Sequence, residues 1–364
     1  MIVKDKHLTT IWYDNSSDKI KIIDQRLLPH EIKFVELNTL QDVCFAIKDM
    51  QVRGAPLIGI TAAYGMYIAA RENSDTNYLK DASIKLKNTR PTAVNLSWAI
   101  DFIFSKIENL NKDNLLTTIL NLANQMRLDD IECCEAIGEN GLKLIKKLYE
   151  KKQSTINILT HCNAGWLATI DWGTATSPIY HAHQIGIKVH VWVDETRPRN
   201  QGASLTAFEL KHENIPHTVI VDNAGGHLMQ HKQVDLVIVG SDRTTINGDV
   251  CNKIGTYLKA LAANANNIPF YAALPISTLD WSIHDGVKNI PIESRSEDEV
   301  THISGLTSQG VIEKIRLVHK DCKAFNPGFD VTPNELVTGL ITEQGICEAD
   351  ENSIRNLYEK NCNL

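Results

Sequence analysis

The chain has 364 residues, of which 43% are hydrophobic, so it can bury a large core and has room for two domains. Its formal net charge of −7 argues against a general role on nucleic acids or membrane surfaces. The segment 1–7 has no apolar signal core, and no apolar stretch reaches membrane-spanning length. Eight scattered cysteines without a CxxC pair favour reduced thiols, no metal site and a cytoplasmic location.

The first part of the chain is predicted to be mainly helical. Two β-like runs, 10–13 and 19–23, flank a polar turn and predict a hairpin. Helical periodicity then predicts helices over 39–48, 58–70, 115–126 and 131–149. The charged stretch 146–154 is typical of a domain boundary. We therefore expect a smaller, mainly helical N-terminal domain with a β-hairpin over residues 1–150.

Strands and helices alternate after this boundary. Strands are predicted over 156–159, 188–193, 217–221, 236–239 and 269–273, with helices over 177–186, 202–213, 224–231 and 254–266. Alternation of this kind favours a parallel sheet with right-handed crossovers. We expect an α/β fold with a Rossmann-like parallel sheet domain over 151–364. Because no GxGxxG motif follows the first strand, no dinucleotide cofactor is expected.

Polar residues follow several of these strands, where ligands bind in open α/β sheets. Asp242 comes directly after the apolar run 236–239, and Asn252 and Lys253 stand at the expected entrance of the helix 254–266, where anions are favoured. Cys162 follows the run 156–159 in a turn whose backbone N–H groups would favour a thiolate. A buried structural cysteine is the alternative at that position.

Two arginines of the helical part are candidate phosphate ligands. Arg53 is followed by Gly54 and Ala55, which leave backbone N–H groups open to a ligand, while the guanidinium can bind a phosphate bidentately. Arg90 precedes Pro91, which can start a helix, so Arg90 should lie on a loop. Taken alone, each arginine fits an ordinary helix entry without a ligand better than a phosphate site.

The loop 194–203 is a third strand end with many charges. Its Asp194, Glu195 and Arg197 fit either a ligand site or a structural ion-pair network that shapes the loop. His161 and His227 are candidate acid–base groups because histidine titrates near neutrality. They rank behind Cys162 and Asp242, and His161 is expected to point to the other side of the loop from its neighbour Cys162.

Six motifs together resemble the methylthioribose-1-phosphate isomerase family, which is homologous to regulatory subunits of the translation initiation guanine-nucleotide exchange factor. The motifs are VRGAP (52–56), RPTAVN (90–95), THCNAG (160–165), VDETRP with QGA (193–203), GSDR (240–243) and GDVCNKIGT (248–256). The similarity continues to NPGFDVTP at 326–333 and so covers nearly the whole chain. The loop 222–230 departs from the family form, which has small and methionine-rich residues in place of Gly225-Gly-His227.

The resemblance implies an aldose–ketose isomerase that converts 5-methylthio-D-ribose 1-phosphate to 5-methylthio-D-ribulose 1-phosphate in methionine salvage. It implies substrate contacts for Arg53, Gly54, Ala55, Arg90 and Gln201, and a phosphate or sugar-hydroxyl contact for Asn252 and Lys253. Asp242 would be the acid–base residue. Cys162 would be either the base for the C2 proton or a neutral group that stabilises the transition state. No cofactor is expected, and the family resemblance implies a homodimer.

Two other functions remain open from the sequence. The first is the same chemistry on 5-deoxyribose 1-phosphate or ribose 1,5-bisphosphate, which the pocket for the 5-substituent decides. A bisphosphate needs additional cations there, whereas an apolar substituent needs Met, Trp or Leu, and Trp166 and Trp172 lie in a suitable region. The second is a non-catalytic regulatory subunit. Relatives of that kind should lack a Cys–Asp pair, and this chain has both Cys162 and Asp242.

Overall fold

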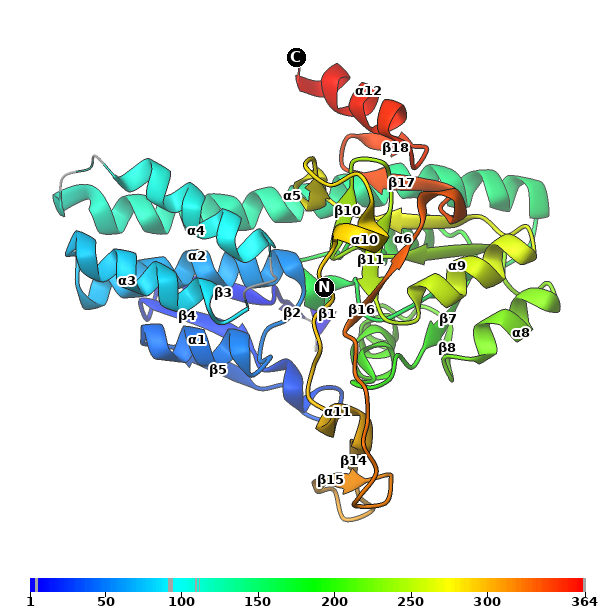
Figure 1. Cartoon of the computed structure of the whole chain (residues 1–364), viewed down its shortest axis with the longest axis horizontal. Helices are drawn as coiled ribbons and strands as arrows, with labels where there is room; N and C mark the ends of the chain where they lie inside the picture. The colour runs from blue at the N-terminus through cyan, green and yellow to red at the C-terminus, as the bar shows by residue number, and fades with distance from the viewer. Residues whose placement is uncertain (4–5, 91–93, 109, 111, 363–364) are drawn as a thin grey trace.

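The computed structural model describes residues 1–3, 6–90, 94–108, 110 and 112–362. A helical part formed by the first third of the chain lies beside a part built on a large sheet (Figure 1). One long helix, α5 (Lys112–Lys152), runs along both parts. This arrangement confirms the predicted fold class. The predicted division into domains at residue 150 stays a prediction.

The N-terminal part starts with the predicted hairpin. Strand β3 (Ile11–Asp14) pairs antiparallel with β4 (Lys19–Ile23), which also pairs with β5 (Phe34–Leu37). The Asp14 carboxylate closes the turn by accepting hydrogen bonds from Ser16 and Lys21. The short strands β1 (Ile2–Val3) and β2 (Lys6–His7) precede this sheet.

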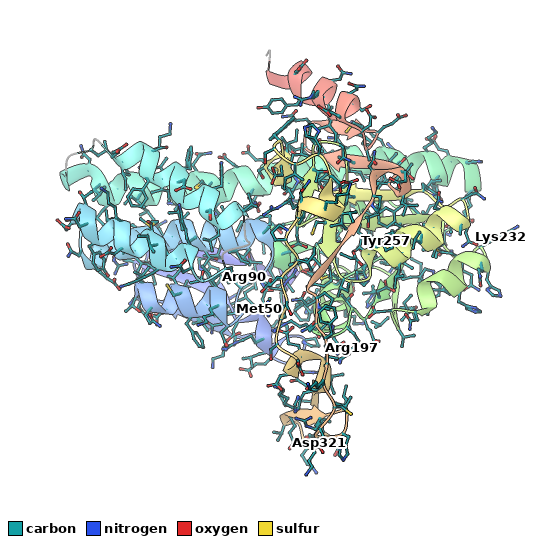
Figure 2. The ribbon with its side chains drawn as sticks, in the orientation of Figure 1. Met50, Arg90, Arg197, Lys232, Tyr257 and Asp321 are labelled. Carbon is teal, nitrogen blue, oxygen red and sulfur yellow. The ribbon has the colours of Figure 1, made fainter. Side chains whose placement is uncertain are left out.

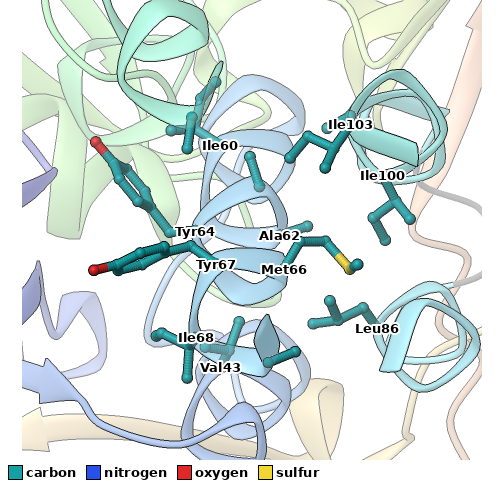
Figure 3. Packing of buried hydrophobic residues seen from close by; sticks show 14 of the residues in the cluster. Val43, Ile60, Ala62, Tyr64, Met66, Tyr67, Ile68, Leu86, Ile100 and Ile103 are labelled. Carbon is teal, nitrogen blue, oxygen red and sulfur yellow. The ribbon is translucent and has the colours of Figure 1, made fainter. Parts of the chain in front are cut away.

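Helix α2 is the centre of the helical part. It is packed by α1 (Leu40–Lys48), α3 (Thr76–Lys87), α4 (Val94–Ile107) and the first half of α5. Every residue of α2 (Ala55–Glu72) from 57 to 70 is buried, so the helix is enclosed on all sides (Figure 3). Helices α3 and α4 were not among the predicted elements. The two helices predicted over 115–149 form one continuous helix, because no glycine or proline interrupts residues 127–130.

The second part is built on a seven-stranded sheet with the order β18-β17-β12-β9-β6-β7-β8. The five predicted strands are confirmed and parallel: β6 (Ile156–Thr160), β7 (Val189–Asp194), β8 (His217–Ile220), β9 (Leu236–Val239) and β12 (Phe270–Ala273). Parallel β17 (Gly339–Thr342) and antiparallel β18 (Gly345–Cys347) extend it. From β6 the chain proceeds toward one edge through β7 and β8, and from β9 toward the other. The topological switch point, where such sheets bind ligands, therefore lies between β6 and β9.

Helices cover both faces of this sheet. Ile158 belongs to an apolar cluster with Ile179, whereas the adjacent Leu159 belongs to a cluster with Met229 and Ala260. Consecutive side chains of a strand point to opposite faces, so these clusters are two core layers. The covering helices are the second half of α5 together with α6 (Ser177–Gln184), α7 (Ala207–His212), α8 (Ala224–Gln230) and α9 (Thr256–Ala265). The predicted helix 202–213 begins as a π-helical turn, η3 (Gly202–Thr206), before α7.

A second sheet corrects the expectation for Asn252 and Lys253. Its order is β13-β10-β11-β16, formed by Leu279–Asp280, Arg243–Thr245, Val250–Lys253 and Phe329–Thr332. Asn252 and Lys253 end strand β11 instead of entering a helix. Gly255, with a left-handed φ of 103°, separates them from α9, and the Asp330 carboxylate accepts hydrogen bonds from the Gly255 and Tyr257 N–H groups.

The remaining elements are short, apart from a final helix. Strands β14 (His302–Leu306) and β15 (Ile312–Arg316) form a hairpin that projects from the molecule, and α12 (Glu351–Cys362) lies at the opposite side (Figure 1). Single turns are η1 (Gln25–Leu27), η2 (Trp166–Ala168), η4 (Ile276–Thr278), α10 (Gly286–Asn289), α11 (Asp298–Thr301) and η5 (Asn334–Leu336). Within the described ranges, no helix has the length and apolarity needed to cross a membrane.

Candidate active site

A cavity of about 70 Å³ lies at the switch point, outside the carboxyl ends of β6 and β9. All nine predicted site residues line it: Arg53, Gly54, Ala55, Arg90, Cys162, Gln201, Asp242, Asn252 and Lys253. The helical part contributes Arg90 and Met50 from its side of the boundary (Figure 2). The structure thus brings these residues together from both parts of the chain, while their roles stay predictions.

Three cations surround one carboxyl group in this cavity. Burial raises the pKa of Asp242 above its usual value, although the charges of Lys253, Arg53 and Arg90 act to lower it. Burial also lowers the pKa of Lys253, against the opposing effect of nearby Cys162 and Asp242. A carboxyl with a raised pKa can hold a proton closer to neutrality, which suits a general acid.

Backbone conformation brings Arg53 and the start of α2 to the cavity. Gly54 caps α2 with a φ of 88°, and a Cβ atom there would lie 2.3 Å from the Ala168 carbonyl oxygen. Only glycine fits this close approach. Pro56 occupies the first turn of α2, as predicted. The helix start predicted at Pro91, next to Arg90, falls in 91–93, outside the described residues.

Cys162 and Asp242 occupy equivalent places after neighbouring strands. The Cys162 N–H donates to Thr196 Oγ1 at 2.8 Å, and Sγ lies 3.3 Å from the Gln201 amide oxygen. A thiol can donate a hydrogen bond to that oxygen. The Asp242 N–H donates to the Cys251 carbonyl at 2.9 Å, which fixes the loop after β9 against strand β11.

His161 lies in the cavity wall and joins three segments. Its Nδ1 is 2.8 Å from Asp194 Oδ2, and its Nε2 is 2.8 Å from the carbonyl oxygen of Ile254, next to Lys253. Asp194 also pairs with Lys259 at 3.2 Å. The sequence left open a structural ion-pair network among Asp194, Glu195 and Arg197. Asp194 does take part in such a network, but its partners are His161 and Lys259. Arg197 instead donates to backbone carbonyls.

The same cluster includes a group with metal-ligand chemistry. His161, Asp194 and Asp222 bring one ligand atom each to within 4.8 Å of one another. The Lys259 ammonium contacts both the Asp194 carboxylate and the Asp222 carbonyl oxygen, so a cation already neutralises this corner. The residues present therefore fit a positioning network better than a metal centre.

Several residues singled out in the sequence lie outside the cavity lining. His227 is exposed on α8 and packs on His231, and the 222–230 loop contributes no lining residue within the described chain. Trp166 is buried in a separate apolar cluster, and Trp172 packs on His181. The expectation that these tryptophans line the pocket is wrong. The apolar lining comes from Met50, Ala55, Pro56, Ala164, Ala168, Pro275 and Phe329.

A strap of alternating charges begins at Arg90 in the cavity wall. Arg90 lies 3.6 Å from Glu293, which pairs with Arg295 at 3.0 Å. Arg295 pairs with Glu299 at 2.7 Å, and Glu299 with Arg199 at 2.9 Å. Burial acts to raise the pKa of Glu299, but Arg295 and Arg199 lower it to about 2. The strap therefore stays charged at neutral pH and joins Arg90 to the 194–203 loop.

A wider cavity of about 410 Å³ adjoins the first. The two share Met50, Arg53 and Gln201. Its other cations are already paired: Arg26 with Asp24 and Asp49, Arg199 with Glu299, and Lys314 with Asp298. Among the described residues, this cavity therefore adds no cluster of unpaired Arg or Lys side chains beside the site.

Two side chains important to the site were not predicted. Asn163 lines the cavity beside Arg53 and Glu209 lies behind Asn163, with exposed fractions of 3% and 0%. Arg53 donates from Nη1 to the Asn163 side-chain oxygen and from Nη2 to its carbonyl oxygen at 2.7 Å. Asn163 lies inside the THCNAG motif, which was a usable signal, whereas Glu209 has no motif around it.

Comparison with known proteins matches this architecture. The model of the initiation factor 2 subunit family matches residues 51–349. A methylthioribose-1-phosphate isomerase of Methylocella silvestris is 56% identical over 99% of both chains. The crystal structure of 5-methylthioribose 1-phosphate isomerase from Pyrococcus horikoshii OT3 superposes with a TM-score of 0.83 at 38% identity, covering 98% of this chain and 97% of that one.

A translation factor is also a structural neighbour. Initiation factor eIF-2B subunit delta from A. fulgidus superposes with a TM-score of 0.80 at 36% identity and covers 97% of this chain and 100% of its own. The two kinds of relative agree with the homology that the sequence motifs implied. The chain belongs to the initiation factor 2 subunit family and, within it, to the methylthioribose-1-phosphate isomerase family.

Proposed function

We propose that this protein is an aldose–ketose isomerase that converts 5-methylthio-D-ribose 1-phosphate to 5-methylthio-D-ribulose 1-phosphate in methionine salvage. The observation that carries the proposal is the meeting of Cys162 and Asp242 with three cations in one cavity at the switch point. Near-full-length relatives named for this isomerase activity support it. The proposal needs no metal or cofactor.

The reaction places two demands on the site. The anomeric oxygen of the substrate carries the phosphate, so the sugar ring must open while the phosphate stays on C1. A hydrogen, as a proton or a hydride, must then move from C2 to C1. The site must therefore hold a dianion, supply a proton to the ring oxygen and exclude water from the open-chain intermediate.

Asp242 is the proposed acid–base residue. Because burial raises its pKa, it can protonate the ring oxygen and then take the proton of the C2 hydroxyl. Cys162 is the proposed partner in the hydrogen transfer. Its contact with the Gln201 amide oxygen fits a thiol that donates a hydrogen bond. A nearby phosphate would repel a thiolate, so it also favours the uncharged thiol. This arrangement suits hydride transfer better than proton abstraction by a thiolate.

The cations are the proposed phosphate ligands. Arg53 offers a planar pair of donors, Lys253 a point charge and Asn252 an amide. Gly54 and Ala55 present backbone N–H groups at the start of α2, where the helix dipole favours an anion. The apolar lining, which includes Met50 and Phe329, suits an uncharged 5-substituent better than a second phosphate.

The test is a turnover assay with three sugars offered in parallel: 5-methylthioribose 1-phosphate, 5-deoxyribose 1-phosphate and ribose 1,5-bisphosphate. We expect turnover of the first, lost in Asp242→Asn and kept in Asp101→Asn, which changes an exposed carboxylate of α4. Preference for another sugar would keep the chemistry and change the pathway. No turnover of any sugar would favour a regulatory subunit without catalysis.

We also propose that the chain forms a homodimer and works in the cytoplasm. The homodimer follows from the family resemblance, and the cytoplasmic location follows from the scattered cysteines, which favour reduced thiols. Light scattering behind size exclusion at two protein concentrations tests the first, with a monomer mass as the contradicting result. Fractionation of cells that express the chain tests the second.

A further inference from the structure

Arg53 reaches the cavity from a buried chain of hydrogen bonds. Asn163 accepts from Arg53 through its side-chain oxygen and donates through Nδ2 to Glu209 Oε1 at 2.8 Å and Thr206 Oγ1 at 3.1 Å. Arg53 itself is 7% exposed. A guanidinium has five N–H donors, and Asn163 takes two of them, so donors remain for a ligand.

The chemistry of the two end groups fixes the orientation of the amide between them. Glu209 as a carboxylate only accepts hydrogen bonds, and Arg53 only donates them. Asn163 must therefore turn its NH₂ group to Glu209 and its oxygen to Arg53. The reversed amide would leave a donor facing Arg53 and an acceptor facing Glu209, both buried, and buried unpaired groups are costly.

Glu209 also holds the loop that carries Cys162. Besides Asn163, it accepts from the N–H groups of Trp166 at 3.0 Å and Leu167 at 2.8 Å and from the Tyr180 hydroxyl at 2.7 Å. A Cβ atom on Gly165 would lie 1.9 Å from Glu209 Oε2, so the glycine of the motif admits the carboxylate. Burial raises the pKa of Glu209, and these hydrogen bonds oppose the rise.

We propose that Glu209 and Asn163 are positioning residues that orient Arg53 for the phosphate of the substrate. Asn163 holds Arg53 directly, and Glu209 acts on Arg53 through Asn163 and the loop. The assignment of a phosphate to Arg53 rests on the proposed function. The orientation of Arg53 by Asn163 rests on the hydrogen bonds alone.

The test is a double-variant cycle read by two measurements. Asn163→Asp replaces the Nδ2 donor with a second carboxylate oxygen facing Glu209, so the side chain at 163 is no longer held in its place beside Arg53. We expect KM for 5-methylthioribose 1-phosphate to rise, and affinity for inorganic phosphate to fall, by at least about tenfold. Adding Glu209→Gln gives the new carboxylate an amide donor and should recover part of that loss, because the same amide nitrogen also faces the Leu167 N–H. Adding Tyr180→Phe removes a different donor from Glu209 and should recover nothing.

Each outcome decides the inference. A double variant no better than Asn163→Asp alone, or unchanged KM and phosphate affinity in Asn163→Asp, overturns it. If Asn163→Asp does not fold, Asn163→Leu takes its place and should show the same tenfold loss of phosphate affinity. Normal phosphate affinity in Asn163→Leu overturns the inference. If the wild type isomerises no sugar but phosphate binding follows the cycle, the proposed function fails and this inference stands. If phosphate does not bind either, both fail.

Discussion

Asp130 on α5 is predicted to destabilise the protein at neutral pH, and its replacement by asparagine should reveal how much. It lines a cavity of about 490 Å³ that shares Pro56 and Pro275 with the catalytic cavity. Its Oδ2 accepts one hydrogen bond, from the Ile170 N–H at 2.9 Å. Burial raises the pKa of Asp130 from 3.8 to about 7.

The magnitude follows from this shift. A rise of about 3 pKa units corresponds to at most about 4 kcal/mol at 1.36 kcal/mol per unit, because Asp130 is only partly buried and lines a cavity. Because the folded pKa lies above the unfolded one, the folded state binds the extra proton between about pH 4 and pH 7. Stability is therefore lost as pH rises through that window, and the full penalty is present above pH 7. An asparagine side chain in place of Asp130 would remain neutral and keep the bond to Ile170 through its amide oxygen.

Urea unfolding of wild type and Asp130→Asn at pH 5, 7 and 8 measures the effect. We expect the variant to be more stable by up to about 4 kcal/mol at pH 8 and by less than about 2 kcal/mol at pH 5, with turnover unchanged. Asp129→Asn, an exposed neighbour on the same helix, is the control and should show no such gain. A variant less stable than wild type at pH 8, or a gain independent of pH, would refute the reasoning.

Three substitutions in the cavity test the proposed roles by steady-state kinetics. Asp242→Asn should lower kcat by at least about 10²-fold with substrate binding retained, and a near wild-type rate would remove it as the acid–base group. Cys162→Ser should lower kcat by about 10² to 10⁴-fold, and a smaller loss would leave the thiol a packing role. Lys253→Ala should raise KM, and an unchanged KM would place the phosphate elsewhere.

The assembly of the site was predictable because of one property of parallel sheets. Their strand carboxyl ends meet at one edge, so Cys162 after β6 and Asp242 after β9 had to lie close together. Asp194, which ends β7, contacts His161 for the same reason. No comparable rule predicts where the arginines of the helical part lie relative to the sheet. Arg53 and Arg90 were placed at the site only by the family resemblance, and both line the cavity.

The failures have local physical causes. Lys253 was assigned to a helix entrance because an apolar run follows it. In the structure Lys253 ends strand β11, and Gly255, in a left-handed conformation, separates that strand from helix α9. Trp166 and Trp172 lie close to Cys162 in sequence, yet closeness in sequence does not determine the direction of a side chain. Glu209 resembles an ordinary helix-surface charge in the sequence, and its partner Asn163 lies 46 residues away.

The electrostatics of the cavity couple substrate binding to acid catalysis. Three cations face one carboxyl, and burial lowers the pKa values of Arg53 and Lys253, so their charged forms are disfavoured in the cavity. A bound phosphate dianion offsets those cations and repels the ionised form of Asp242, which raises its pKa further. Turnover needs the protonated acid, so the loss of activity with rising pH should occur at higher pH in kcat, which reports the complex, than in kcat/KM, which reports the free enzyme. Parallel pH–rate profiles measure both. An equal or lower pKa in kcat would mean that the phosphate lies away from Asp242, and the proposed assignment of the three cations would have to be abandoned.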